Sequence, residues 1–463
     1  MIKFGTDGWR GVIGDDFTFD NVKLVSQAIA HYLKKEGRQR KRVVIGYDRR
    51  FLSQEFAAQV SCVLAANKIN VVLSSKSIPT PTVSFHTLYG KYDLGVMITA
   101  SHNPAKFNGL KIKTKDGGAA DKSLTDKIER LLGKSKIKDM PLQEAMTRKF
   151  VEIKNLDNAY VKFLKGFFDI KKIRKLKLKI LMDNMYGVGN GFVERVIQPS
   201  SIKIDYLNSE FNPSFGGRHP EPIEENLSAL IRRVKKEKYD LGIALDGDAD
   251  RIAAVTSQGE FINAQVILPL LAIHVAKNRG GCIGIGKTVV GSNLVDVVAL
   301  SLGVPCYETP VGFKYISNLF KENLISIGGE EAGGIGFKNY IPERDGSASF
   351  LMLLEMIAYE RKSFGELLND LWRNHGRWFY TRTSFSIKRI RGSFDKMKIP
   401  QSLLGKKIER INKSDGIKLI TKESWLMFRK SGTEPIIRVY AEARSKKELS
   451  SLISLGRRII HSL

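Results

Sequence analysis

The feature that most constrains the fold of this 463-residue chain is a repeated alternation of short apolar runs with helical patterns. Residues 43–47, 69–73 and 94–98 are short, apolar and rich in β-branched side chains, which is typical of strands. Between the first two runs, the pattern of Ser53–Ala66 indicates a helix. Strands that alternate with helices predict parallel or mixed sheets with helices on both faces.

The alternation restarts near residue 178 and near residue 259, and strand-like segments dominate from about residue 377 until one closing helix. Because 463 residues exceed what one hydrophobic core usually organises, we predict an α/β protein with three related α/β domains containing mixed sheets, followed by a smaller C-terminal α+β domain. The predicted domains are 1–150, 151–258, 259–376 and 377–463. Their further strands and helices are expected at residues 178–183, 202–207, 241–245, 259–262, 266–276, 282–285, 324–327, 380–387, 417–420, 425–429 and 436–441.

The formal net charge of +27 attracts polyanions, but it would equally steer small phosphate esters into a site. Basic residues are spread along the chain, and the densest run, residues 171–179, has the alternation expected where a strand with a solvated face begins. No nucleic-acid-binding motif accompanies this run, so no specific nucleic-acid partner is expected. A polyanion-binding protein remains the alternative from another functional class, and its affinity would fall steeply with salt.

Two further features concern location. The longest dense apolar stretch, residues 266–273, is interrupted by Pro269 and is far shorter than the ~20 residues that span a bilayer. The first residues lack the apolar core of a signal peptide, so we expect no membrane association and a cytoplasmic protein. Cys62, Cys282 and Cys306 form no CxxC pair and are interpreted as buried structural thiols.

Three carboxylates stand at alternate positions directly after the apolar run 241–245; they are Asp246, Asp248 and Asp250. On a loop at the carboxyl end of a strand, they can converge on one hard cation with oxygen ligands. An EF-hand would need glycine and glutamate where Arg251 and Ser257 stand, so that interpretation fails. An acidic surface turn is the alternative, and Arg251 would serve phosphate or hold the loop.

A second segment of interest is residues 99–104, because the strand before it delivers Ser101 to the rim of a sheet, where α/β active sites usually lie. Ser101 lacks the GxSxG elbow of hydrolases. His102 is adjacent, but adjacency alone does not establish a general base. Serine, histidine and asparagine are also common in turns and caps, so the segment alone leaves both interpretations open.

Two glycine-rich loops, residues 328–334 and 429–435, lie further along the chain. The second follows one strand and precedes another, and Arg429, Ser431 and Thr433 would suit a phosphate dianion. Each loop could instead be a simple connecting turn. Residues 281–288 formally fit the P-loop pattern G-x-x-x-x-G-K-[ST], but a helix precedes them and an apolar strand crosses them, which disfavours nucleotide binding.

Together, these segments resemble the α-D-phosphohexomutase superfamily, the phosphoglucomutase/phosphomannomutase group. The similarity spans the chain through residues 4–11, 99–104, 246–251, 329–334 and 429–435. The resemblance implies four domains around a central cleft and an isomerase of carbohydrate metabolism that acts on a phosphosugar. A monomer or homodimer is expected.

The resemblance also implies a mechanism. Ser101 is expected to carry a phosphoryl group in the resting enzyme and to bind Mg²⁺ together with Asp246, Asp248 and Asp250. This group would pass to the free 6- or 1-hydroxyl of a hexose phosphate, giving a bound bisphosphate such as glucose 1,6-bisphosphate. The intermediate would turn around and return its other phosphoryl group to the serine.

Further roles follow from the same resemblance. Arg10 and Lys111 would flank the transferring group, with Lys111 as candidate general acid/base and His102 organising the serine loop. Glu330 and Lys314 would contact the sugar. The non-reacting phosphate would be gripped by Arg429, Ser431, Gly432 and Thr433.

The chain departs from the family pattern at two positions. Ala332 stands where many members have a serine that contacts the sugar, which removes one hydrogen bond worth about 0.5–1.5 kcal/mol. Gly334 replaces the histidine of the GEMSGH and GEQSGH variants, which argues against the phosphoglucosamine branch and favours glucose and mannose phosphates. A phosphatase on the same scaffold, which loses the bisphosphate to water, is a third hypothesis.

Overall fold

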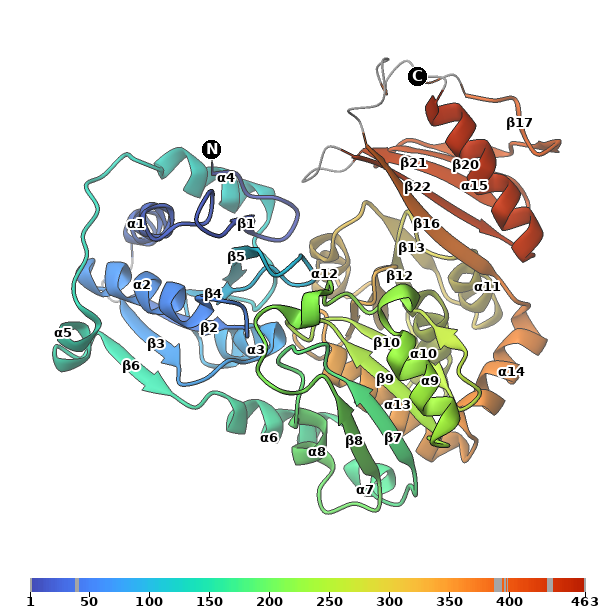
Figure 1. Ribbon diagram of the computed structural model, residues 1–463, viewed down its shortest axis with the longest axis horizontal. Helices are drawn as coiled ribbons and strands as arrows, with labels where there is room; N and C mark the ends of the chain where they lie inside the picture. Colours follow the sequence, from blue (N-terminus) through green and yellow to red (C-terminus); the bar gives the residue numbers. More distant parts are fainter. Residues whose placement is uncertain are drawn as a thin grey trace.

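The computed structural model describes residues 2–37, 41–386, 394, 397, 399–430 and 436–461. Four sheets of four to six strands follow one another along the described chain. Figure 1 shows the first of them on the left, the second and third together in the middle and the last at the upper right. The three α/β units and the smaller C-terminal unit confirm the predicted fold class.

The first sheet has six strands in the order β1-β5-β4-β2-β3-β6. Its elements are Trp9–Val12 (β1), Phe19–Lys35 (α1), Arg42–Tyr47 (β2), Ser53–Ala66 (α2), Asn70–Ser74 (β3), Thr80–Tyr89 (α3), Leu94–Ile98 (β4), Phe107–Thr114 (β5), Lys122–Leu131 (α4), Leu142–Thr147 (α5) and Val151–Lys154 (β6). Strand β5 runs antiparallel to β1 and β4, whereas β2, β3, β4 and β6 pair in parallel.

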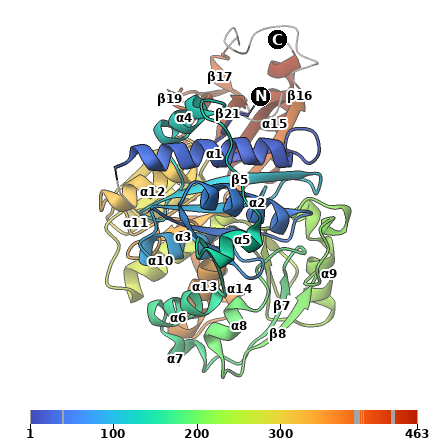
Figure 2. The ribbon, with the colours of Figure 1, turned by 90° about the vertical axis from the view of Figure 1, so that its left-hand side faces the viewer.

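Alternate side chains of β2 fill the two faces of this sheet, as the period of a strand requires. Val43 and Ile45 join the core formed with α1 and α2, while Val44 lies on the other face beside Val83 of α3. Figure 2 shows α1 and α2 in front of the strands. The carboxyl end of β4 therefore emerges between two covered faces.

The second sheet has the order β11-β10-β9-β7-β8. Its elements are Asp157–Phe167 (α6), Ile170–Ile173 (α7), Lys179–Asp183 (β7), Phe192–Ile197 (α8), Lys203–Leu207 (β8), Ser228–Lys236 (α9), Leu241–Leu245 (β9), Ile252–Thr256 (β10) and Phe261–Ile262 (β11). The expectation that residues 259–262 open the third unit is wrong. Strand β11 pairs antiparallel with β10 and so completes the second sheet, because a tight turn at Gly259 folds the chain straight back.

The third sheet has the order β13-β12-β14-β15. Its elements are Ala264–Asn278 (α10), Ile285–Thr288 (β12), Asn293–Ser301 (α11), Cys306–Thr309 (β13), Phe313–Lys321 (α12), Ile327–Gly329 (β14), Ile335–Phe337 (β15), Gly346–Glu360 (α13) and Phe364–His375 (α14). One continuous core joins this sheet to the second, with α10 and α13 between them. The second and third units are therefore packed as one block.

Two predicted strands of the third unit begin later than expected. Strand β12 starts at Ile285 rather than residue 282, because Gly280 and Gly281 adopt positive φ and Ile283 is exposed. Strand β14 starts at Ile327 rather than residue 324. In both places the turn before the strand also contains apolar residues, so the sequence pattern does not mark where the strand begins.

The last sheet is antiparallel in the order β16-β22-β21-β20-β19 and is backed by α15. Its elements are Phe379–Ser386 (β16), Arg410–Asn412 (β19), Ile417–Ile420 (β20), Trp425–Lys430 (β21), Ile436–Ala443 (β22) and Lys446–His461 (α15), with the short hairpin Ser402–Leu403 (β17) and Lys406–Lys407 (β18) beside it. Leu452 and Ile460 of α15 are buried against the sheet, as its helical spacing predicts.

Smaller expectations have mixed outcomes. Cys62 is buried, but Cys282 and Cys306 are only partly buried, so the expectation of three buried thiols is wrong for two of them. The P-loop match is a coincidence, since Lys287 lies on β12 and its Nζ pairs with Asp296. In the described part of the chain, no helix combines the length and apolar character needed to cross a membrane.

Candidate active site

The serine loop begins where β4 ends. Ser101 is fully buried and adopts a φ of 52°, a left-handed conformation that costs a non-glycine residue about 1–3 kcal/mol. Its backbone N–H donates to Thr99 Oγ1 at 2.8 Å, and that hydroxyl in turn donates to Asp48 Oδ2 at 2.6 Å. The strain is thus held in place by a local network of hydrogen bonds.

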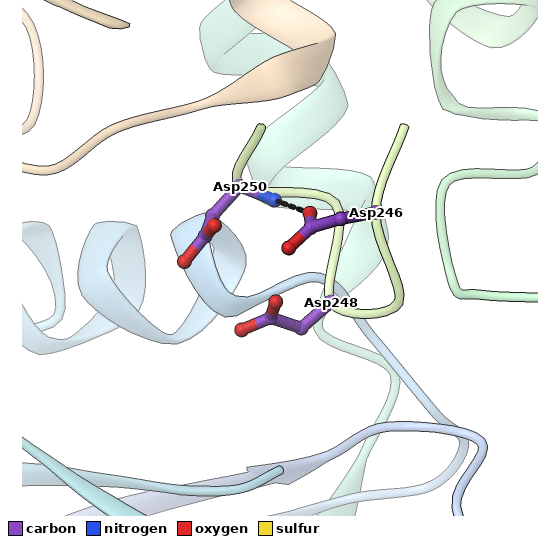
Figure 3. Close-up of side chains that lie close together, drawn as sticks. All are labelled: Asp246, Asp248 and Asp250. Atoms are coloured by element: carbon purple, nitrogen blue, oxygen red, sulfur yellow. Dashed lines mark hydrogen bonds between the residues drawn. The ribbon is translucent and has the colours of Figure 1, made fainter. Parts of the chain in front are cut away.

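The carboxylate loop begins where β9 ends, and it folds back on itself through Ala249 at a φ of 56°. Asp246 Oδ1 accepts hydrogen bonds from the backbone N–H groups of Asp250, at 2.9 Å, and Arg251, at 3.1 Å. As Figure 3 shows, the three aspartates point toward one another, and one oxygen of each lies within 4.8 Å of the others. Because of this turn, the carboxylates of three aspartates spaced two residues apart lie close together.

The two loops meet. Ser101 Oγ donates to Asp246 Oδ2 at 3.1 Å and lies 3.5 Å from His102 Nδ1. Burial, reinforced by the cations of Arg251 and Arg10, lowers the pKa of His102 well below its usual value, so the imidazole is neutral. A buried hydroxyl is thereby placed against a buried carboxylate.

Lys111, on β5, supplies the opposing charge. Its Nζ lies 2.8 Å from Asp248 Oδ2, 3.1 Å from Asp250 Oδ2 and 2.9 Å from Asp7 Oδ2. Thr80 Oγ1 donates a further hydrogen bond to Asp248 Oδ2 at 2.5 Å. Because the ammonium is 1% exposed, these contacts are made in a low-dielectric environment, where they are strong.

Burial and charge separate the pKa values of the aspartates. Burial and the neighbouring carboxylates raise the pKa of Asp246 well above its usual value. Burial acts the same way on Asp248, but Lys111 outweighs it and the pKa falls below its usual value. Burial also disfavours the Lys111 ammonium, yet the carboxylates around it raise its pKa. The cluster is therefore arranged around a charged lysine.

The donor set fits a hard divalent cation. Carboxylate oxygens are the ligands that Mg²⁺ prefers. Asp248 Oδ1 and Asp250 Oδ1 are buried and accept no hydrogen bond among the described residues, although buried carboxylate oxygens are normally paired. Buried carboxylate oxygens without a hydrogen bond are available as ligands for a cation.

Sequence reasoning missed Arg344 and Asp7, which complete this centre. Arg344 Nη1 donates to Glu330 Oε2 at 2.6 Å, Nη2 to Asp7 Oδ2 at 2.5 Å, and Nε lies 2.9 Å from Asp250 Oδ2. Arg344 follows β15 in a segment with no phosphate-binding motif, and Asp7 lies in residues 4–11, where the resemblance points to Arg10 alone. The only local signal for Arg344 is that it stands between two acidic residues, Glu343 and Asp345.

The remaining predicted residues surround this centre. Arg10 Nη1 donates to Asn103 Oδ1 at 2.5 Å, so it is held by the serine loop. Arg251 Nε lies 3.7 Å from Asp250 Oδ1 and 3.9 Å from Asp246 Oδ2, too far for hydrogen bonds. Lys314 lies in the first turn of α12, with Nζ 5.3 Å from the centre of the Tyr315 ring.

The two glycine-rich loops have different outcomes. Ala332 is partly buried and lines a cavity of about 740 Å³ together with Glu331 and Gly333. Arg429, on β21, has its Nε 3.0 Å from Asp415 Oδ2, which also accepts from the Val311 N–H. The predicted phosphate contacts Ser431, Gly432 and Thr433 lie outside the described residues.

Comparison with protein-family models matches the chain in four consecutive segments. The models are phosphoglucomutase/phosphomannomutase alpha/beta/alpha domain I at residues 1–138, domain II at 158–259, domain III at 263–375 and the C-terminal domain at 385–454. The chain belongs to the phosphoglucomutase/phosphomannomutase family. The predicted resemblance to the α-D-phosphohexomutase superfamily is confirmed.

Relatives within this family cover the whole chain. The phosphoglucomutase/phosphomannomutase of Thermococcus kodakarensis is 30% identical over 99% of this chain and 98% of its own. The phosphoglucosamine/phosphogalactosamine mutase of Sulfurisphaera tokodaii is 31% identical over the same shares. Among solved structures, one described as a putative phosphomannomutase from Thermus thermophilus gives a TM-score of 0.88 at 32% identity, covering 99% of each chain. The protein is thus a phosphohexomutase, an isomerase of hexose phosphates.

Proposed function

We propose that this phosphohexomutase interconverts the 1- and 6-phosphates of glucose or mannose through a phosphoserine at Ser101 and a bisphosphorylated sugar. One observation carries the proposal: Ser101 Oγ donates a 3.1 Å hydrogen bond to Asp246, one of three buried carboxylates with a common focus. A nucleophile held against a cation site is the arrangement that phosphoryl transfer requires, because the reaction depends on positioning and charge neutralisation.

The proposed cycle consists of two phosphoryl transfers, one from Ser101 to the sugar and one from the sugar back to Ser101. The bond between phosphorus and Ser101 Oγ breaks while the free hydroxyl of a hexose monophosphate bonds to phosphorus. The proton of that hydroxyl ends on Ser101 Oγ, which leaves free serine and a hexose 1,6-bisphosphate. The bisphosphate then turns around, and its other phosphoryl group returns to Ser101 by the reverse step.

The residues around Ser101 have distinct proposed roles. Lys111 is assigned the exchanging proton as general acid/base. Its ammonium, which is buried among carboxylates, also offsets negative charge. Arg10 lies on the serine loop through Asn103, where its cation can face the transferring group. Neutral His102, 3.5 Å from Ser101 Oγ, orients the hydroxyl rather than ionising it.

We propose Mg²⁺ as the cation, held by Asp246, Asp248, Asp250 and an oxygen of the phosphorylated Ser101. When bound, such an ion neutralises charge on the phosphoryl oxygens. The chain contributes the rest of the arrangement: Lys111 and Thr80 fix one oxygen of Asp248 and leave the other without a hydrogen bond.

The remaining contacts are assigned to the sugar and its non-reacting phosphate. Glu330, whose Oε2 accepts from Arg344, is proposed to hold sugar hydroxyls, with Lys314 and Ala332 nearby in the same unit. The phosphate is assigned to Arg429, Ser431, Gly432 and Thr433. We place these serine, metal, sugar and phosphate loops on four domains, of which the first ends after β6, the second after β11 and the third near residue 376.

Gly334 supports glucose and mannose over glucosamine phosphates. A Cβ atom at this position would lie 2.4 Å from Arg344 Cδ, so a histidine there requires Arg344 to move. The site of this chain is therefore organised differently from one built on the GEMSGH pattern. Its relatives include both phosphoglucomutases and phosphoglucosamine mutases, so the substrate must be assayed directly.

The test is a coupled assay of glucose 1-phosphate, mannose 1-phosphate and glucosamine 1-phosphate with Mg²⁺ and a catalytic amount of glucose 1,6-bisphosphate. We expect conversion of the first two to their 6-phosphates. Intact mass should show one phosphate adduct on the wild type and on Ser75→Ala, an exposed control serine, and none on Ser101→Ala.

Two outcomes contradict the proposal. Release of free sugar and inorganic phosphate, rather than 6-phosphate, would instead establish a phosphatase. An adduct that persists on Ser101→Ala would move the nucleophile to another residue.

A further inference from the structure

One buried guanidinium holds the serine loop from behind. Arg50 Nη2 donates to the backbone carbonyls of Ser101, at 2.6 Å, and Asn103, at 2.7 Å. Its Nη1 donates to the carbonyls of Pro104, at 2.9 Å, and Phe107, at 3.0 Å. Four carbonyls of one short segment therefore converge on a single side chain that is 2% exposed.

Arg50 is itself fixed on both sides. Its backbone N–H donates to Asp48 Oδ1 at 2.9 Å, and its Nε lies 3.3 Å from Asp48 Oδ2. That same Oδ2 accepts from Thr99, whose hydroxyl receives the Ser101 N–H, so Asp48 links Arg50 to the loop a second time. Phe215, from the second unit, places its ring 4.8 Å from the guanidinium carbon.

These contacts explain how the left-handed conformation of Ser101 persists. Such a conformation survives only where the surroundings determine it. Four carbonyls turned toward the protein interior need donors, since an unpaired buried carbonyl costs about 1–3 kcal/mol. Arg50 donates to all four, because a guanidinium offers five N–H groups in a rigid plane, and the Pro104 carbonyl has a second donor in the Phe107 N–H at 3.0 Å. An ammonium offers three donors from one point and cannot reach both pairs.

The serine hydroxyl and Arg10 depend on the same backbone. Ser101 Oγ reaches Asp246 at 3.1 Å, and Asn103 Oδ1 accepts from Arg10 at 2.5 Å. Arg50 holds the carbonyls of both Ser101 and Asn103. A shift of this segment would therefore move the nucleophile and a neighbouring cation together.

We propose that Arg50, braced by Asp48, is a positioning residue for phosphoryl transfer: it sets the direction of Ser101 Oγ and the place of Arg10 without touching the substrate. The inference rests on the proposed phosphoserine function. Two tasks are thereby divided between different residues. Lys111 and the aspartates provide the charged groups around the transferring phosphoryl group, and Arg50 fixes the backbone conformation of the serine loop.

The experiment compares Arg50→Lys with Arg49→Lys. Arg49 is the adjacent arginine, and its Nη1 donates to the Ser209 carbonyl of the second unit instead of the serine loop. Each full-length enzyme is freed of phosphate and mixed with glucose 1,6-bisphosphate, and the phosphorylation rate of Ser101 is followed by intact mass. Steady-state kcat and KM for glucose 1-phosphate are measured alongside.

Arg50→Lys should slow phosphorylation of Ser101 and lower kcat about 100-fold, the scale that a misplacement of 1 Å can cause. KM should change little, because the sugar and phosphate contacts remain. Arg49→Lys should keep the wild-type values. Asp48→Asn, which preserves volume and removes the brace, should give an intermediate rate and serves as the second variant if Arg50→Lys does not fold.

Separate results overturn the separate claims. If the wild type takes up phosphate at a residue other than Ser101, both the proposed function and this inference fail. If the wild type is phosphorylated at Ser101, and the Arg50 and Asp48 variants are phosphorylated as fast as Arg49→Lys, only the role of Arg50 fails. A rise in KM as large as the fall in kcat, together with a lowered melting temperature, would also overturn the role of Arg50, because that result indicates general destabilisation.

Discussion

Arg344 Nε lies 2.9 Å from Asp250 Oδ2, so a residue that follows β15 of the third sheet reaches the carboxylate loop that follows β9 of the second. The other two nitrogens of the same guanidinium donate to Glu330 and to Asp7 of the first unit. One planar group thus serves three carboxylates from three parts of the chain. This fork geometry cannot be reproduced by a lysine.

Replacing Arg344 should therefore lower activity, and by more when the positive charge is also removed. Hydrogen bonds to charged groups are worth about 1.5–3 kcal/mol each, and about 1.4 kcal/mol corresponds to a factor of ten. We expect kcat/KM to fall about tenfold in Arg344→Lys and about 100-fold in Arg344→Gln, which leaves three carboxylates without their shared cation. Arg373→Lys, an exposed position, is the matched control. Equal activity in all three variants would show that Arg344 is a bystander.

Gly334 is expected to be required because of Arg344. The side chain of Arg344 packs so closely that an added Cβ would lie 2.4 Å from its Cδ. Gly334→Ala should displace the guanidinium and lower kcat/KM about tenfold, as loss of one charged hydrogen bond would. The control is Gly365→Ala in α14, where a Cβ meets no atom within 4 Å. Full activity of Gly334→Ala would indicate that Arg344 can move aside without consequence.

Much of the site could be predicted from sequence because its residues are close together in the chain. Asp246, Asp248 and Asp250 form one short loop, and a strand before them places that loop at a sheet edge. Arg344, Asp7 and Arg50 could not be found this way. Most of their partners are remote in the sequence: Arg344 and Asp7 are 337 residues apart, and Arg50 reaches the backbone carbonyl of Ser101, 51 residues further on. Neither relationship leaves a local pattern.

The fold shows the same division. Buried strands such as Leu94–Ile98 and Leu241–Leu245 have the predicted bounds, because continuous apolar runs define them. The assignment of β11 to a sheet failed, since two residues carry no information about their partner strand. The late start of β12 has a different cause: glycines at positive φ keep apolar residues outside the strand.

Removing metal should abolish turnover, and adding it should stabilise the protein. Chelation should stop mutase activity, and Mg²⁺ should restore it. A ligand at 100 times its Kd stabilises the folded state by about 2.7 kcal/mol, so Mg²⁺ should also raise the melting temperature of the wild type. Asp248→Asn should lose most of this rise, whereas Asp126→Asn, an exposed carboxylate on α4, should keep it. An undiminished rise in Asp248→Asn would remove Asp248 from the ligand set.

Ala332→Ser should alter the choice between sugars. A hydroxyl added at this partly buried position can form one hydrogen bond, worth about 0.5–1.5 kcal/mol. This corresponds to a rise of about two- to twelvefold in kcat/KM for the sugar whose hydroxyl it reaches. The measurement is the ratio of kcat/KM for glucose 1-phosphate and mannose 1-phosphate in both enzymes. An unchanged ratio would place Ala332 away from the hydroxyls by which these sugars differ.

Lys418, on β20, should make stability depend on pH. It is 1% exposed, and its Nζ lies 3.1 Å from Glu308 and 4.6 Å from the centre of the Trp425 ring. Burial, aided by the nearby charge of Lys287, lowers the pKa of Lys418 to about 8, although Glu308 opposes the change. The unfolded amine keeps a pKa near 10.5. The unfolded chain therefore binds more protons between these two values.

Stability contributed by this group must then rise with pH over that window, because stability increases wherever the unfolded state binds more protons. Below pH 8 the folded protein carries a buried ammonium at full cost, and above pH 10.5 both states are neutral. The total change is on the order of 3 kcal/mol. Lys418→Met keeps the buried volume and removes the titration. The free energy of unfolding of the wild type, minus that of Lys418→Met, should increase from pH 7.5 to 9.5. A constant or falling difference would show that burial does not lower the pKa of Lys418.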